Sequence, residues 1–151
     1  DTLIGNTDRH QDNWGVIWVY ENNILTPSRM TPVFDNGTSL GHEIFQNKFN
    51  EFDKEERISR YVSRGYHHMK WTLDDKARLN QVDFIQRLII EYPETRSVVA
   101  NLMKFDTSKL ESDIIELTKF EVSCPLSYER AKFIIKLLVF RRNKILSILG
   151  N

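Results

Sequence analysis

The chain has 151 residues, of which 40% are hydrophobic, and its 21 Lys and Arg residues balance 21 Asp and Glu residues. A neutral chain of one-domain length lacks the positive surface of a dedicated nucleic-acid-binding protein, so we expect no direct nucleic-acid partner. Cys124 is the single cysteine, which excludes an internal disulfide and a multi-cysteine zinc site. No apolar segment approaches the roughly 20 residues of a membrane span, and we find no signal peptide, so a soluble cytoplasmic protein is expected.

Turn-forming residues are concentrated in the first 41 positions, which hold Gly5, Gly15, Gly37, Gly41, Pro27 and Pro32. The β-branched and aromatic run 14–20, the turn-prone residues 21–23 and the apolar pair 24–25 predict a short hairpin. Trp14 and Trp18 are expected to pack this hairpin onto the helices. A second short strand is predicted over residues 30–34, at a sheet edge because it contains Pro32.

The rest of the chain is helical by its apolar periodicity. Helices are predicted over about 51–64, 82–92 and 127–149, and two more carry the apolar stripes 98–103 and 110–117. Asp106, Thr107 or Ser108 is expected to cap the fourth helix, and Arg141, Arg142 and Lys144 favour the C-terminal part of the last one. The predicted fold class is α+β and predominantly helical, with a turn-rich unit 1–41 and a helical subdomain 51–149.

Most of the unusual polar chemistry lies between Asn6 and Gly37. Asp8 and Asn13 stand five residues apart, and only the predicted hairpin separates Asn13 from Asp35. A hairpin returns the chain close to its start, so these three side chains are expected to converge.

The same groups match the needs of phosphoryl transfer. That reaction requires a carboxylate that orients or accepts the hydroxyl proton, and hard oxygen ligands for Mg²⁺. Protein kinases place them in the patterns H-R-D-x-x-x-x-N and D-F-G. The spacing from Asp8 to Asn13 reproduces the first pattern, and Asp35-Asn36-Gly37 has the D-x-G form of the second.

Two segments carry a family resemblance, GNTDRHQDNWG at 5–15 and PVFDNGTSLG at 32–41. They resemble the C-terminal kinase lobe of HipA-like proteins, the serine/threonine kinase toxins of bacterial toxin–antitoxin modules, over about residues 3–41. Phosphatidylinositol kinases, more distant relatives of the same fold, carry a similar pair of motifs, D-R-H-x-x-N and D-F-G. The implied architecture is a kinase C-terminal lobe with a small hairpin beside the catalytic loop.

The resemblance also implies roles for individual residues. Asp8 matches the catalytic Asp, and Asn13 and Asp35 match the residues that bind Mg²⁺ and, through it, ATP. Arg9 and His10 occupy the D-R-H positions, and His10 is expected to be catalytic, orienting Asp8 or lying near the transferred phosphoryl group. The implied activity is ATP- and Mg²⁺-dependent phosphorylation of a protein Ser or Thr, with a DNA-binding antitoxin as a further partner.

The chain opens at Asp1 without a methionine, and it shows neither the Gly-rich loop nor the strand lysine with which kinases hold ATP. We therefore expect one piece of a longer protein, without the N-terminal lobe. Such a piece should fold, bind Mg-ATP weakly and transfer negligible phosphate. It should also expose an apolar patch near Leu3, Ile4 and residues 14–20, where the absent lobe docks.

Two alternatives remain open at this stage, a lipid or small-molecule kinase of related fold and a non-catalytic helical binding module. Three other features favour ordinary structural roles. His67 and His68 have no Cys or carboxylate partner at ligand spacing and are expected at the surface. The basic run 57–70 is interpreted as a solvated helix face, and Cys124 as an inert thiol.

Overall fold

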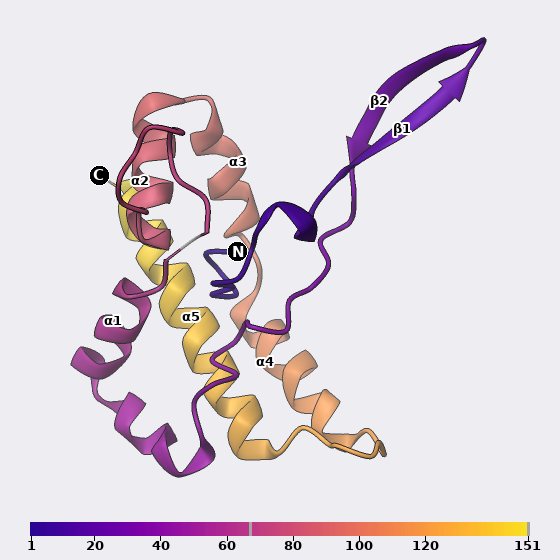
Figure 1. Ribbon diagram of the computed structural model, residues 1–151. Coiled ribbons are helices and arrows are strands. Elements are labelled where there is room, and N and C mark those ends of the chain that lie inside the picture. The colour runs from indigo at the N-terminus through magenta and orange to yellow at the C-terminus, as the bar shows by residue number, and fades with distance from the viewer. Residues whose placement is uncertain (67, 151) are drawn as a thin grey trace.

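The computed structural model describes residues 1–66 and 68–150, and about half of them are helical (Figure 1). Among the described residues, a short 3₁₀-helix (η) precedes a two-stranded hairpin, and five α-helices follow, with a second 3₁₀-helix before the first of them and a third before the last. In chain order the elements are η1 (Gln11–Asn13), β1 (Val16–Glu21), β2 (Ile24–Met30), η2 (Gln46–Asp53), α1 (Glu55–Ser63), α2 (Gln81–Glu91), α3 (Thr95–Leu102), α4 (Thr107–Glu116), η3 (Leu117–Lys119) and α5 (Tyr128–Gly150). The α+β class expected from the sequence is confirmed.

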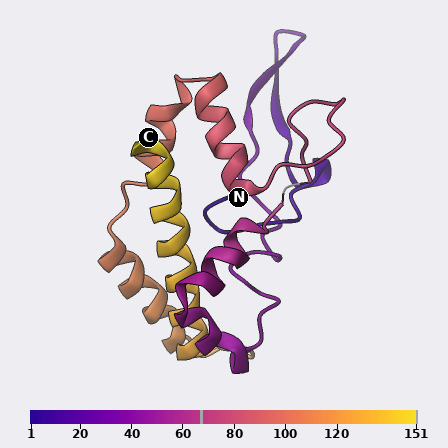
Figure 2. The same ribbon diagram turned by 90° about the vertical axis from the view of Figure 1, so that its left-hand side faces the viewer.

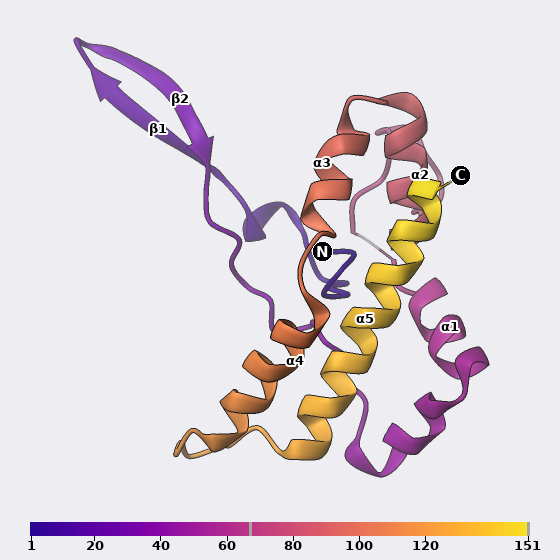
Figure 3. The same cartoon turned by 180° about the vertical axis from the view of Figure 1, so that it is seen from behind.

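The long helix α5 is the centre of the helical part. It packs against α1, α2, α3, α4 and η2. Seen from behind, α3 and α4 lie on one side of α5 and α1 lies on the other (Figure 3). The view turned by 90° shows α5 running the length of this part of the molecule (Figure 2). A helix surrounded in this way needs apolar side chains on more than one face.

Two apolar clusters line α5. In the first, the ring of Phe133 stacks on that of Phe49 with centroids 4.3 Å apart and meets Phe52 edge-on at 5.0 Å. Phe52 is 1% exposed, and burying a side chain of this size contributes roughly 1.5–3 kcal/mol. The second cluster joins the other end of α5 to α2 and α3 through Ile89, Val99, Met103 and Ile145.

Helix boundaries follow local signals in the sequence. The side chain of Asn80 accepts hydrogen bonds from the backbone N–H groups of Val82 and Asp83 at the start of α2. Asp106 caps α4 in the same way, which decides between the three expected capping residues. The helix predicted over about 51–64 is present as α1, but it begins at Glu55, because Lys54 is extended (φ −80°, ψ 121°) and separates it from η2.

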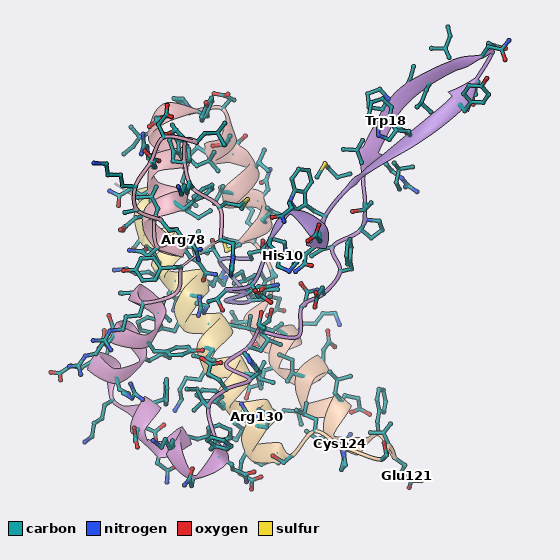
Figure 4. The ribbon with its side chains drawn as sticks, viewed as in Figure 1. His10, Trp18, Arg78, Glu121, Cys124 and Arg130 are labelled. Carbon is teal, nitrogen blue, oxygen red and sulfur yellow. The ribbon has the colours of Figure 1, made fainter. Side chains whose placement is uncertain are left out.

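The hairpin is present, but it does not pack as expected. Asn22 and Asn23 both have positive φ (53° and 62°), as a tight two-residue hairpin turn requires. Trp14 and Trp18 are 47% and 52% exposed, so the prediction that they pack the hairpin onto the helices is wrong. The hairpin projects away from the helical part, and Trp18 lies out on this arm (Figure 4).

The strand predicted over residues 30–34 is also wrong. The second strand begins at Ile24 and ends at Met30, and Thr31 adds one more hydrogen bond, from its N–H to Gly15 O at 2.9 Å. Pro32 then follows without an N–H to donate, and residues 32–34 pair with no strand in the described chain.

Within the part of the chain that the structure describes, no helix has both the length and the apolar character needed to cross a membrane.

Candidate active site

The polar loop and the D-x-G turn are joined by one buried side chain, that of Asn6. Its Nδ2 donates to Asp35 O at 3.2 Å, and its Oδ1 accepts from the backbone N–H of Asp8 at 2.9 Å. The hydroxyl of Thr38 donates to the same oxygen at 2.9 Å. Asn6 is 0% exposed, so these bonds form away from water and hold the two segments in fixed register.

Arg9 makes a second, independent connection. Its Nη1 donates to Asn13 O at 3.0 Å and also to Phe34 O, and its Nη2 donates to Asn36 Oδ1 at 2.6 Å. One guanidinium group therefore lies between the loop and the turn. The carboxylate of Asp1 accepts from the other edge of the group, at 3.0 Å from Nη2, which balances the charge of a side chain that is 6% exposed.

Two further buried polar residues tie this unit to the helices. Gln81, the first residue of α2, donates from Nε2 to Asn6 O, and its Oε1 accepts from Arg141 Nη1 at 3.0 Å. Arg141 on α5 also donates to Thr2 O at 3.1 Å. Burial lowers the pKa of Arg141, whereas the nearby Tyr61 and Glu43 act in the opposite direction.

Gly5 is required where Arg141 approaches the chain. It adopts φ +69°, and a Cβ placed there would lie 2.4 Å from Arg141 Nη2. Only glycine combines this left-handed backbone with so close an approach. The loop that carries Asp8 is therefore packed directly on α5.

The carboxylate of Asp8 is half-exposed and has one partner among the described residues. His68 Nε2 lies 3.3 Å from Asp8 Oδ1, with side-chain exposures of 40% and 47%. His68 is exposed, as expected, and the carboxylate that it contacts comes from a distant part of the sequence, so no ligand spacing indicated the contact. Residue 67, the other half of the His-His pair, lies outside the described residues.

His10 lies next to this pair, between the base of the hairpin and the helices (Figure 4). Its ring meets that of His68 edge-on, with centroids 6.2 Å apart. The backbone N–H of Asp12 donates to His10 Nδ1 at 3.3 Å, so His10 caps the short helix η1. No hydrogen bond joins His10 to Asp8 among the described residues.

Asn13 and Asp35 have the donor chemistry for Mg²⁺. Asn13 is 4% exposed, its Nδ2 donates to Asp8 O at 2.9 Å, and no residue in the described part of the chain donates to its Oδ1, which can act as a ligand. The carboxylate of Asp35, on a backbone with φ +53°, has no hydrogen-bond or ion-pair partner within the described ranges 1–66 and 68–150. Carboxylate and amide oxygens are the hard ligands that Mg²⁺ binds, usually with several waters.

The described residues contain no group of three or more His, Cys, Asp or Glu side chains that is suited to a metal ion. A metal at Asn13 and Asp35 therefore depends on one amide, one carboxylate and oxygens from water or a phosphate. Such a sparse set is typical of Mg²⁺ bound together with a nucleotide rather than in an all-protein cage.

Asn13 also borders an open apolar hollow. The hollow has a volume of about 730 Å³ and is lined by Leu3, Ile4, Trp14, Met30, Val33 and Met69, with Arg9 and Asn13 at its polar edge. The exposed apolar patch expected near Leu3, Ile4 and the hairpin is thus found. It adjoins one of the two candidate Mg²⁺ ligands.

Sequence reasoning overlooked most of the residues that hold this site together. It assigned no role to Asn6, Gln81 or His68, and it expected Arg141 to act on the C-terminal part of its helix. Arg141 is 3% exposed and points inward instead. A signal was present, since Arg141 stands three residues after Leu138 and four before Ile145, on the apolar stripe of α5.

Comparison with known proteins supports a kinase-like fold. The structure is similar to the crystal structure of CtkA, a proinflammatory kinase of Helicobacter pylori, with a TM-score of 0.66 and 23% sequence identity. The match covers 99% of this chain and 48% of that kinase, so the chain spans about half its length. No protein-family model and no curated protein matches the sequence. At this identity the likeness establishes the fold, and the chain therefore has the fold of part of a kinase.

Proposed function

We propose that this chain is the C-terminal lobe of a HipA-like kinase that transfers a phosphoryl group from Mg-ATP to a Ser or Thr hydroxyl of a protein. The observation that carries the proposal is the double connection between the loop of Asp8 and Asn13 and the turn of Asp35, through Asn6 and Arg9. The likeness to a kinase over nearly the whole chain supports it independently.

Asp8 is the proposed catalytic base. Its carboxylate is half-exposed and accepts no bond from Asn6 or Arg9, so one oxygen remains available to an acceptor hydroxyl. Its role is to orient that hydroxyl and to take its proton as the phosphoryl group is transferred. His10 stays a candidate catalytic group through its position beside Asp8, although its Nδ1 is used by Asp12 N–H.

Asn13 and Asp35 would hold Mg²⁺, and ATP would be held through the metal. Bound there, Mg²⁺ would neutralise the negative charge of the phosphates. Asp35 comes from the D-x-G turn and Asn13 from the catalytic loop, so any movement between the two segments would spoil the pair. Arg9, which donates to the backbone of both segments, keeps them together.

The nucleotide site is incomplete in this lobe alone. The apolar hollow beside Asn13 is open, and in the hairpin next to it β2 is exposed along its whole length and β1 is exposed except at Ile17 and Val19, which are partly buried. We propose that an N-terminal lobe covers this face. A DNA-binding antitoxin encoded beside the gene is the partner that the toxin interpretation requires, and sequencing the neighbouring gene checks it directly.

Transfer of phosphate from radiolabelled Mg-ATP by the full-length protein tests the proposal. The Asp8→Asn and Asp35→Asn variants are expected to lower the rate at least about 100-fold, because each removes charge from the reacting centre. Glu121→Gln is the control and should change the rate by less than about twofold, since Glu121 is an exposed carboxylate far from His10 (Figure 4).

The acceptor is tested in the same assay with casein and with vesicles that contain phosphatidylinositol. Labelling of casein or of the protein itself supports a protein kinase, whereas labelling of lipid alone would replace the proposed acceptor. If the full-length protein transfers phosphate to no acceptor, the alternative of a non-catalytic helical binding module is favoured. For the isolated chain, calorimetric titration should show weak Mg-ATP binding, and tight binding with turnover would show that this lobe is sufficient.

A further inference from the structure

His68 reaches the carboxylate of Asp8 from a segment far along the chain. Its Nε2 lies 3.3 Å from Asp8 Oδ1, and Asp8 has no other side-chain partner among the described residues. We propose that His68 is a positioning residue, which holds Oδ1 of the base so that Oδ2 is presented to the acceptor hydroxyl. This inference rests on the proposed function, because it assumes that Asp8 is the base.

The segment that carries His68 is tied at both of its ends. Gln81 N–H donates to Gly65 O at 2.8 Å, and Tyr66 and Asn80 form an isolated antiparallel bridge. Gln81 is also the residue that bonds Asn6, which in turn bonds the backbone of Asp8. The base of the segment and the loop of Asp8 are therefore fixed to each other through one buried amide.

The segment is anchored again three residues beyond His68, at Trp71. The indole Nε1–H donates to Glu91 Oε2 at 3.0 Å, and the Arg87 guanidinium lies 4.9 Å from the ring. The ring of Phe84 meets the indole at 5.1 Å. All three partners belong to α2, so His68 projects from a segment that a helix holds in place. A histidine on a freely moving loop would have no such support.

The neighbouring residue Met69 lines the apolar hollow together with Trp14 and Met30. His68 and Met69 thus place one polar group on the proposed base and one apolar group in the hollow. The two neighbouring side chains therefore have different surroundings, one polar and one apolar.

The chemistry of the contact favours orientation of the base over its blockage. The Nε2 contact lies on one carboxylate oxygen, Oδ1, and Asp8 remains 47% exposed. A contact on one oxygen restricts the rotation of the carboxylate, and in this proposal that restriction directs the second oxygen toward the acceptor hydroxyl. The two histidines are also distinct, since His10 is engaged by Asp12 N–H rather than by Asp8.

The contact itself is tested by NMR on this chain, without any assumption about activity. We expect an NOE between the His68 ring and the Asp8 β protons. Asp8→Ala should shift the ring signals of His68 most, whereas the matched variant Asp12→Ala should shift those of His10 most, because the Asp12 carboxylate lies 3.6 Å from His10 Nδ1. Absence of the NOE, or equal responses to both variants, would overturn the inference.

The role is tested by steady-state transfer of radiolabelled phosphate to casein by the full-length protein. His68→Ala should lower kcat about tenfold while KM for ATP stays within about twofold, because the nucleotide does not contact His68 in this proposal. His68→Gln, whose amide N–H can reach the same oxygen, should recover kcat to within about threefold of the unmodified protein. The control is His42→Ala, which removes an exposed histidine paired with Glu43.

Unchanged kcat in His68→Ala, or loss that glutamine does not recover, would refute the positioning role while leaving the proposed function intact. Activity that survives Asp8→Asn would refute the proposed function, and it would also refute the role of His68, which assumes that Asp8 is the base. The NMR result would then still establish whether the contact exists.

Discussion

The buried unit beneath the candidate site and the hairpin arm reverse the usual distribution of side chains. Asn6 and Gln81 are polar and 0% exposed, whereas Tyr20 and Ile24 on the arm are 67% and 62% exposed. Buried polar groups and exposed apolar groups are the observations that carry information, because the opposite arrangement is ordinary. The two regions meet at Asn13 and Trp14, where the loop leads into β1.

The difference shows what decides burial in this chain. Asn6 is buried because every polar atom of its side chain is paired, with Asp35, Asp8 and Thr38. The arm stays exposed because two strands alone cannot cover either of their faces. Burial therefore depends on available partners, and the arm lacks them within the described residues. The following predictions test each half of this contrast.

The largest effect is expected at Asn6. Asn6→Ala removes four side-chain hydrogen bonds and leaves the backbone N–H of Asp8 and the carbonyl of Asp35 without these partners, which should lower the free energy of unfolding by about 3 kcal/mol. Urea denaturation of this chain measures it. Asn47→Ala is the control, an exposed asparagine in η2, and should change stability by less than about 0.5 kcal/mol. Equal losses in Asn6→Ala and Asn47→Ala would show that the buried hydrogen bonds of Asn6 do not stabilise the fold.

Arg9→Lys is expected to lower the free energy of unfolding by about 2 kcal/mol, somewhat less than Asn6→Ala does. Lysine keeps the charge, but it cannot bond Asn13 O, Asn36 Oδ1 and Asp1 with one planar group. Arg29→Lys on the exposed strand β2 makes the same chemical change where the structure shows no side-chain partner in the described chain, and it should be neutral. Thermal unfolding of the two variants side by side compares them, and a similar fall in Tm would contradict the role of Arg9.

Ser39 provides a prediction of opposite sign. Its hydroxyl is buried and has no hydrogen-bond partner among the described residues, so Ser39→Ala should raise stability by about 1 kcal/mol. The comparison is Ser127→Ala at the start of α5, where the hydroxyl accepts from Arg130 N–H at 3.2 Å and removal should cost about 1 kcal/mol. Differential scanning calorimetry would reveal the two shifts. Destabilisation by Ser39→Ala would mean that its hydroxyl is paired in solution.

Much of the fold was predictable because its signals are local. Apolar periodicity located α2, α3, α4 and α5, and the asparagine pair at 22–23 marked the hairpin turn. The break at Lys54 was not predictable in the same way, since Phe49 and Phe52 stand three residues apart, a spacing that suits a 3₁₀-helix and an α-helix alike. The exposure of Trp18 was unpredictable from its sequence neighbours, because it depends on whether another part of the fold packs against the arm, and no described segment covers this side chain.

In the candidate site, too, residues marked by local sequence spacing could be predicted, whereas residues placed by the tertiary fold could not. Asp8, Asn13 and Asp35 could be selected from their spacing, and whether they act in catalysis stays a prediction. Arg9 stood in the motif, but its role depends on carbonyl groups of residues 13 and 34, which no pattern specifies. His68 could not be selected at all, because its contact with Asp8 joins segments that only the tertiary fold brings together.

The smallest effect on the stability of this chain is expected at Trp18. Comparing this chain with the full-length protein there tests whether the exposed arm gains a partner. Trp18→Thr keeps a residue suited to a strand and removes a side chain that is 52% exposed, so unfolding of this chain should change by less than about 0.5 kcal/mol. If an N-terminal lobe covers the arm, the same substitution should lower the free energy of unfolding of the full-length protein considerably more, because it would remove a buried tryptophan contact. Urea denaturation of both lengths measures the difference. A neutral result in both would show that nothing in the full-length protein packs on this face of the arm, and a large loss in the short chain would show that the arm folds back onto the helices in solution.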